Sequence, residues 1–195
     1  ANVSFSLTDS AGNTYSQVGY AVNTGQLRTY IFAAYNVNAL PASSTITINA
    51  GVSVTARAAV ASVFRGLADA DPLDRTSTGT GSNDAPSAGP TSTTTEANEL
   101  LIGAIGTEGP SGDPAGTWAN SFTAGPRTGT TGGTEDTNIT ISLGYRIVSA
   151  TGAYTAAKSG ITSRDWAAVI ATFKAESDPN APRITITGTP LSAFS

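Results

Sequence analysis

Apolar and polar residues alternate along three short stretches of the chain, which is the pattern of a β-strand with one face in a core. These stretches cover residues 3–8, 44–50 and 183–189. Longer apolar or alternating runs predict further strands at 27–37, 52–67, 98–106, 138–148, 153–157 and 165–175. We divide the run at 52–67 into two strands joined by a bend, because its apolar residues do not form one helical stripe. The pattern predicts about ten strands and no helix.

Polar segments rich in Gly and Pro mark the connections between these strands. Asp9, Gly12 and Asn13 supply the side-chain hydrogen bonds and the positive φ angle of a tight hairpin turn, so we expect a second strand to begin near Thr14. Residues 76–95 contain no Leu, Ile, Val or aromatic residue. Because this segment has nothing to bury, it predicts a long surface loop.

One octamer in the first half of the chain matches another near the end. Residues 58–65 read AAVASVFR and residues 167–174 read AAVIATFK. Either the match is accidental in an alanine-rich chain, or the same strand unit occurs twice, and two such units would bury their apolar faces against each other. We predict an all-β fold, a two-layer antiparallel β-sandwich of the jelly-roll kind with an internal pseudo-repeat.

The composition excludes much of the usual chemistry of enzymes. None of the 195 residues is Cys, Met or His, so thiolate nucleophiles and the commonest general base and metal ligand are absent. No Ser lies in a nucleophile motif. The carboxylates, Glu99 among them, fall in loops or at strand edges, where we expect them to serve solubility. We predict that the protein is not an enzyme and requires no cofactor.

Charge and hydropathy narrow the partners and the location. The net charge is −4, and the ten Lys and Arg residues are scattered singly, which excludes a basic nucleic-acid interface. No apolar run approaches the roughly 20 residues that span a bilayer. A chain that starts with Ala1 and is rich in Thr, Ser, Ala and Gly suits a processed secreted protein or an excerpt of a longer one. We expect an extracellular or cell-surface location.

Three closely spaced acidic residues are the candidates for a metal site. Asp69, Asp71 and Asp74 lie in the segment DADPLD, and calcium takes several carboxylate and carbonyl oxygens from irregular loops. The pattern of an EF-hand is absent. We favour a solvated turn, with Asp71 preceding Pro72, and keep a calcium site as the alternative.

A few aromatic residues are candidates for binding a sugar, since exposed rings stack on sugar faces. Trp118 lies in a Gly- and Pro-flanked segment, and Tyr15 and Tyr20 lie by the first predicted turn. For Trp118 we favour a role in the core or as a loop anchor, with a ligand platform as the alternative. A glycan is the partner that this alternative implies.

We divide the chain into a β-sandwich domain at 1–176, a polar linker with two prolines at 177–183 and a terminal strand at 184–195. The terminal strand has three destinations: its own sheet, a following domain, or the edge of a neighbouring copy. In the last case a ladder of backbone hydrogen bonds would join subunits, as in β-strand addition. A contact of this kind does not close on itself and would build a filament.

The residues that we expect to join subunits lie at the two ends of the chain. Ile184 and Ile186 alternate along the terminal strand, and Val3, Phe5 and Leu7 alternate along the opposite terminal strand. Partners in this interpretation are copies of the same chain or neighbouring surface domains.

Several phrases of the sequence resemble a known class of modules. TDSAGNTYS, FRGLADADPLD and ANELLIGAIG look like parts of β-sandwich modules of large secreted bacterial surface proteins, and ITITGTPLSAF resembles the opening strand of the Ig-like repeats that follow such modules. The resemblance implies an extracellular sandwich used for structure, adhesion or ligand binding, and it carries over no catalytic residues. We therefore expect a structural or adhesive subunit of a surface assembly, with a carbohydrate-binding module as the alternative.

Overall fold

The computed structural model describes residues 3–177, 184–186 and 191–192. In this part of the chain the regular elements are β-strands, apart from one turn of 3-10 helix, η1 (Glu135–Thr137). All strand pairings are antiparallel. The predicted all-β, antiparallel β-sandwich class is confirmed, while the jelly-roll connectivity stays a prediction.

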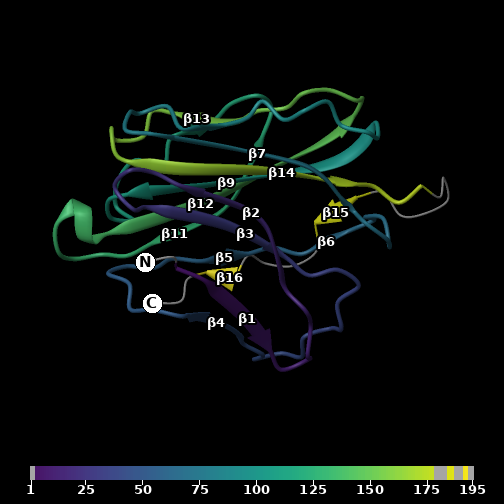
Figure 1. Ribbon diagram of the computed structural model, residues 1–195, viewed down its shortest axis with the longest axis horizontal. Helices are drawn as coiled ribbons and strands as arrows, with labels where there is room; N and C mark the ends of the chain where they lie inside the picture. Colours follow the sequence, from purple (N-terminus) through teal and green to yellow (C-terminus); the bar gives the residue numbers. More distant parts are fainter. Residues whose placement is uncertain (1–2, 178–183, 187–190, 193–195) are drawn as a thin grey trace.

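A five-stranded sheet forms the centre of the molecule (Figure 1). Its strands lie in the order β11 (Thr123–Gly129), β12 (Ile139–Ser149), β9 (Asn98–Glu108), β14 (Trp166–Lys174) and β7 (Leu73–Gly81). The two inner strands β9 and β14 are buried along nearly their whole length. This explains why their sequences are continuously apolar instead of alternating, because both faces of these strands are covered.

Alternate residues of β9 and β14 contribute to two separate cores. Leu100 and Ile102 of β9 face the first core with Val169 and Phe173 of β14. The residues between them, such as Leu101 and Ile170, face the second core on the other side of the sheet. The period of two along a strand places successive side chains on opposite faces, so the same two strands serve both cores.

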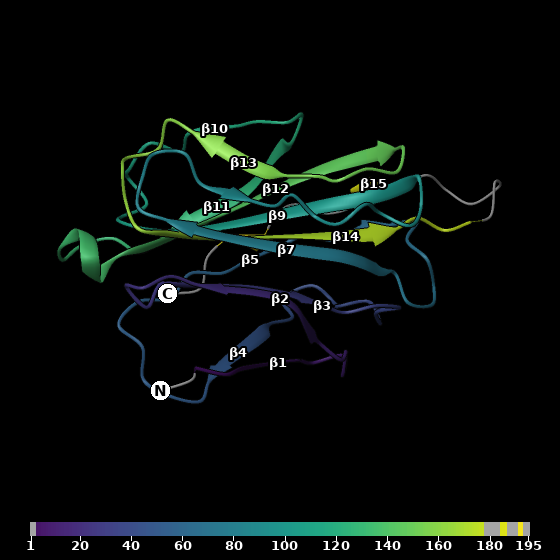
Figure 2. The same cartoon turned by 45° about the horizontal axis from the view of Figure 1, so that its top comes forward.

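Smaller sheets cover the two faces of the central sheet (Figure 2). The ribbon of β2 (Ser16–Val22) and β3 (Arg28–Ala33) covers the first core. It is fastened by the Thr29 hydroxyl, which donates a 2.8 Å hydrogen bond to the Ala167 carbonyl of β14. The opposite face is covered by a sheet with the order β10 (Thr117–Trp118), β13 (Ala156–Ser159) and β8 (Ser87–Ala88).

The remaining strands are short, and β1 and β4 among them lie on the side of β2 and β3, away from β13 (Figures 1 and 2). β1 (Phe5–Asp9) pairs with β4 (Ile46–Ala50). Two-residue strands make the other pairs, which join β15 (Thr185–Ile186) to β6 (Phe64–Arg65) and β16 (Leu191–Ser192) to β5 (Val60–Ala61). The predicted division of residues 52–67 into two strands is confirmed in this shortened form.

The predicted turn after the first strand forms, but the hairpin does not. The Asp9 carboxylate accepts hydrogen bonds from the Ala11 and Asn13 backbone N–H groups, and Gly12 has a φ of 72°. β1 nevertheless pairs with β4, and β2 pairs with β3. The local turn signal predicts only that the chain changes direction after β1. The Phe5 ring of β1 packs edge-on against the Tyr30 ring of β3, which brings β1 onto the β2–β3 ribbon.

The prediction of a surface loop at 76–95 was wrong. Residues 76–81 belong to β7, which pairs with β14 along the edge of the central sheet. Pro86, Thr91 and Thr94 are buried beneath the neighbouring segments. The segment 74–81 of β7, which has no large apolar residue, is stable here because its partner β14 supplies the backbone ladder and the Trp166 ring, which lies against the bare backbone of Gly81.

The two similar octamers do not form equivalent elements. Residues 167–174 lie in β14 and are almost completely buried. Residues 58–65 contain only β5 and β6 with an exposed Val63 between them. β14 pairs with a strand on each side, β9 and β7, whereas β5 and β6 each pair with one strand in the described residues. The match between the octamers therefore reflects composition, and the expected pseudo-repeat is not present in the fold.

Candidate functional site

The strands that we assigned to contacts between subunits lie outside the central sheet. Phe5 and Leu7 belong to β1, where they pair with residues of β4. The Val3 carbonyl accepts a 2.9 Å hydrogen bond from the Tyr30 hydroxyl. The N-terminal strand is thus held within the chain on one edge, and in the described residues its other edge pairs with no strand.

The C-terminal strand is also paired within its own chain. Ile186 lies opposite Phe64 of β6, and the Ile184 side chain packs against the first core. The donation of this strand to a neighbouring copy or its place in a following domain stays a prediction. Residues 178–183, which include most of the predicted linker and the step Asp178-Pro179, lie outside the described residues.

The three aspartates predicted as a metal site do not come together. Among the residues that the structure describes, no group of three or more acidic side chains is placed to hold a metal ion. Asp69 and Asp71 are exposed, and Asp74 turns into the protein to accept hydrogen bonds from the Thr95 backbone N–H at 2.6 Å and hydroxyl at 2.7 Å. The solvated-turn interpretation fits the first two residues, while Asp74 is a buried acceptor.

Asp74 lies beside a second buried carboxyl group that the sequence analysis placed in solvent. Glu99 of β9 is 0% exposed, and no hydrogen-bond partner of good geometry reaches either of its carboxyl oxygens within the described residues. Burial, helped by the negative charge of Asp74, raises the pKa of Glu99 to about 7. Burial also opposes ionisation of Asp74, but the hydrogen bonds from Thr95 outweigh it and lower the pKa of Asp74.

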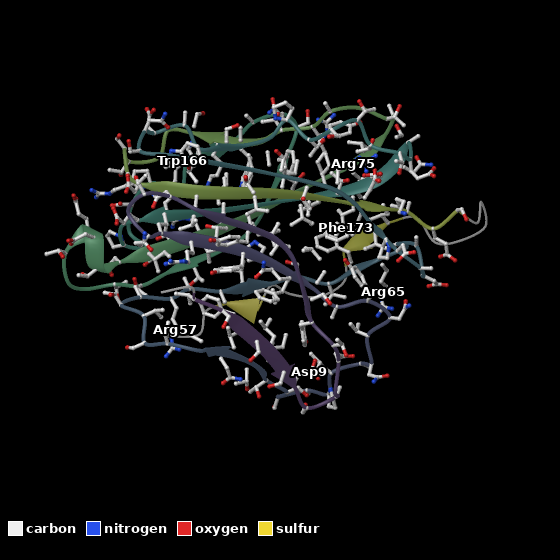
Figure 3. The ribbon with its side chains drawn as sticks, in the orientation of Figure 1. Asp9, Arg57, Arg65, Arg75, Trp166 and Phe173 are labelled. Atoms are coloured by element: carbon white, nitrogen blue, oxygen red, sulfur yellow. The ribbon has the colours of Figure 1, made fainter. Side chains whose placement is uncertain are left out.

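This acidic pair lies at the end of the central sheet near Arg75, far from Trp166 at the other end of β14 (Figure 3). The Arg75 guanidinium approaches the Asp74 carboxylate to 3.6 Å. Glycoside hydrolysis needs two carboxyl groups about 5 to 10 Å apart across a cleft. The Asp74 and Glu99 side chains are enclosed and adjacent, so the arrangement is a buried acid pair instead of a hydrolytic site.

The aromatic residues predicted for sugar binding are on opposite sides of the molecule. Tyr15 donates a 2.6 Å hydrogen bond to the Asp9 carboxylate; burial and this bond raise the pKa of Tyr15 to about 12. Tyr20 is 41% exposed and stacks on Tyr30 with the ring centroids 5.1 Å apart. Both tyrosines belong to the β1–β3 side, whereas Trp118 packs on the second core across the central sheet.

The indole of Trp118 lies flat on two glycines. Gly103 of β9 and Gly144 of β12 are register partners, and a Cβ atom added at Gly144 would lie 2.6 Å from the indole. Phe122 stacks on the same ring with a centroid distance of 5.7 Å. Because glycine pairs allow such close approach, the structure gives Trp118 the role of a core anchor and leaves little of its face for a sugar.

Trp118 also borders a small hollow that is open to solvent. The hollow lies between β10 and β13 on one side and β11 and β12 on the other, and it contains the side chains of Lys158, Arg127 and Ser142. Lys158 is the register partner of Trp118, and Ser142 is the register partner of Arg127. Pairing between neighbouring strands thus brings both cations to one place.

The two cations of the hollow are bound only by neutral groups. The Lys158 Nζ donates a 3.1 Å hydrogen bond to the Ser142 Oγ and lies 5.4 Å from the centre of the Trp118 ring. Arg127 donates to the backbone carbonyls of Ser111 and Asp113. Burial, together with the nearby charge of Arg127, lowers the pKa of Lys158 to about 8.

Comparison with known proteins gives no relative for this chain. No family model, no curated protein sequence and no solved structure matches it. The resemblance to modules of bacterial surface proteins therefore has no support beyond the phrases that suggested it. Within the described residues, no helix is long and apolar enough to cross a membrane.

Sequence reasoning missed the two buried ionisable sites, although one signal was present. Lys is rare in the chain, which contains only Lys158 and Lys174. Lys158 follows two alanines in β13, and the first of them, Ala156, is buried on the same face of the strand. A cation inside an apolar strand is unusual. Its partners Arg127 and Ser142 come from other strands, so only the tertiary structure identifies the hollow.

Proposed function

We propose that the protein is a structural or adhesive subunit outside the cell, joined to neighbouring copies by exchange of its C-terminal strand. The observation that carries this proposal is how the C-terminal strand pairs. Among the described residues, 185–186 pair with β6 and 191–192 pair with β5. Neither β5 nor β6 belongs to the five-stranded central sheet. A strand that pairs outside the central sheet, after a linker with two prolines, can leave its own chain without opening that sheet and occupy the same position on a neighbour.

Exposed apolar side chains support an interface on the same half of the molecule. Among the described residues, seven of the eight large apolar side chains with high exposure belong to residues 20–63, and the eighth is Ile147. The seven are Tyr20, Val22, Tyr35, Val37, Leu40, Val52 and Val63. Apolar surface that gathers on one side of a protein marks a region that contacts other molecules.

The composition agrees with this proposal and the geometry gives less support to carbohydrate binding. A chain without Cys, Met or His has no oxidisable thiol or thioether to lose outside the cell. The rings expected to hold a sugar are engaged with protein groups, Trp118 by the glycine pair and Phe122, and Tyr20 by Tyr30. We therefore favour assembly by strand exchange over carbohydrate binding.

The absence of Cys from the chain makes strand exchange directly testable. Arg65 and Thr185 are register partners in the ladder between β6 and β15. We expect a mixture of two single variants, Arg65→Cys in one chain and Thr185→Cys in the other, to form a disulfide-linked heterodimer when it is oxidised. Mass spectrometry of the linked peptides identifies the bond, and negative-stain imaging at rising concentration shows whether contacts propagate.

A second pair of variants controls for random collisions. Thr8 of β1 and Thr47 of β4 are also register partners, but neither belongs to the C-terminal strand or to β5 and β6, with which that strand pairs. A mixture of Thr8→Cys and Thr47→Cys should give far less heterodimer. Equal yields from the two mixtures, together with a protein that stays monomeric at every concentration, would contradict the proposed assembly.

A further inference from the structure

The hollow beside Trp118 holds two cations that form no ion pair with any of the described acidic side chains. Lys158 is 5% exposed, and within the described residues neither Lys158 nor Arg127 forms an ion pair. Arg164, in contrast, pairs with the carboxylates of Asp113 and Glu135. Arg127 donates a hydrogen bond to the Asp113 carbonyl, while the Asp113 carboxylate bonds to Arg164 and acts on Arg127 only through space.

A buried ammonium group without a counter-ion is costly, because neutral partners replace only part of its hydration. Lys158 keeps one hydroxyl oxygen and one aromatic ring as neighbours. Arg127 faces the same space with a planar group that binds oxyanions through two parallel hydrogen bonds. An anion that enters the hollow from solvent would supply the missing charge to both.

The remaining walls of the hollow indicate the rest of the ligand. Ala115, Ala124, Leu143 and the Trp118 edge line it together with the two cations and Ser142. Apolar walls around a few converging polar groups are typical of a small-molecule site. We propose that the hollow binds a small ligand through its carboxylate, with Lys158, Arg127 and Ser142 on the carboxylate and its apolar body against Trp118 and Ala124.

The proposed site is independent of strand exchange, because Trp118 beside the hollow packs on the second core, whereas Phe64 of β6 packs on the first core across the central sheet. A copy that is locked as a monomer should bind the ligand as well as an assembled one. Failure of the assembly experiment would therefore leave this inference intact, and failure of the binding experiment would leave the assembly proposal intact.

Nuclear magnetic resonance of the isotope-labelled protein tests the site with benzoate as the probe. The chain has two Trp residues, so its spectrum contains two indole N–H signals, and Trp166 serves as an internal reference. Below the pKa of Lys158, we expect benzoate to shift the Trp118 signal saturably and to leave the Trp166 signal in place. Sulfate and phosphate in parallel titrations distinguish a carboxylate site from a general oxyanion site.

Matched variants link the response to the two cations. Lys158→Met and Arg127→Met should each weaken benzoate binding about tenfold or more, since each removes a charge-assisted hydrogen bond. Lys174→Met removes the other lysine of the chain and should leave binding unchanged. If Lys158→Met does not fold, Arg127→Met carries the test. The absence of a saturable shift, a response to sulfate or phosphate alone, or unchanged affinity in both variants would overturn the proposal.

Discussion

At the scale of single residues, Glu99 shows how far burial can change a group that the sequence presents as an ordinary surface acid. Its carboxyl group lies beside the side chains of Thr172 and Asp74, and Arg75 approaches the other side chain of this acidic pair, Asp74. Asp74 stays ionised because Thr95 donates two hydrogen bonds to it. Two adjacent carboxylates in a buried space repel each other, so the pair is most stable when Glu99 holds its proton.

Replacing Glu99 by Gln should therefore flatten the pH dependence of folding. The folded protein holds the Glu99 proton up to a pKa of about 7, while the unfolded chain releases it near 4.5. Stability is therefore lost as pH rises between these values, by about 3 kcal/mol in total. Denaturant unfolding at pH values across this window should show Glu99→Gln gaining about that amount relative to the parent protein.

The exposed Glu96 offers a control, since Glu96→Gln should follow the parent protein at every pH. A difference between Glu99→Gln and the parent protein that does not change with pH would contradict a buried proton on Glu99. Below the unfolded pKa both states of the parent are protonated, so the two proteins should there differ only by the fixed effect of the amide.

At the scale of elements, glycines inside strands decide where layers meet. Gly103 and Gly144 open a flat area across β9 and β12, and β10 lays the Trp118 indole on it. Without this contact β10 would have little to hold it, because it is a two-residue strand paired only with β13 in the described residues. Gly103 and Gly144 thereby also fix the position of the Trp118 ring beside the hollow that contains Lys158.

Gly144→Ala should therefore lower the free energy of unfolding by about 2 kcal/mol, since a methyl group 2.6 Å from the indole forces the ring to move. Chemical denaturation measures this loss, and near-ultraviolet circular dichroism reports the displaced Trp118. Gly112→Ala is the matched control, because a Cβ atom at the exposed Gly112 has nothing within 4 Å. Equal losses of unfolding free energy in the two variants would contradict the packing of the Trp118 ring on Gly144.

At the scale of the whole molecule, β9 and β14 connect the two cores. Each strand gives alternate residues to the first core under β2 and β3 and to the second core under β8, β10 and β13. Neither core can lose its packing without exposing strands that the other also needs. The β1–β4 ribbon, in contrast, has no strand in the central sheet.

The two cores should consequently unfold in one cooperative transition. Trp166 belongs to the second core, and the stacked pair Tyr20 and Tyr30 lies over the first. Tryptophan fluorescence and tyrosine circular dichroism should give the same midpoint in urea. Separate midpoints would show that the faces of the central sheet are independent units. Asp9→Ala removes hydrogen bonds from Ala11, Asn13 and Tyr15 near the turn after β1. This variant should leave both unfolding transitions as steep as those of the parent protein.

The sequence by itself determined the class of the fold and the position of its main strands. The apolar runs that became β9 and β14 and the alternating run that became β12 were predicted nearly to their ends, because burial on one or both faces leaves a direct trace in local hydrophobic pattern. The turn at Asp9, Gly12 and Asn13 was also predicted, since its chemistry is local. Composition excluded thiol and imidazole chemistry before any fold was known.

Only the tertiary structure decided which strands pair, which polar residues are buried and where cations meet. β7 has a single large apolar residue, Leu73, and the rest of it forms a strand because β14 provides its backbone ladder and the Trp166 ring packs on its glycines. Glu99 is buried and Lys158 meets Arg127 because strands distant in sequence are neighbours in the sheet. The hydrophobic pattern of a sequence indicates which positions are buried, but it does not indicate which residues of other strands lie beside them. The pKa and the binding properties of a buried side chain depend on those neighbours.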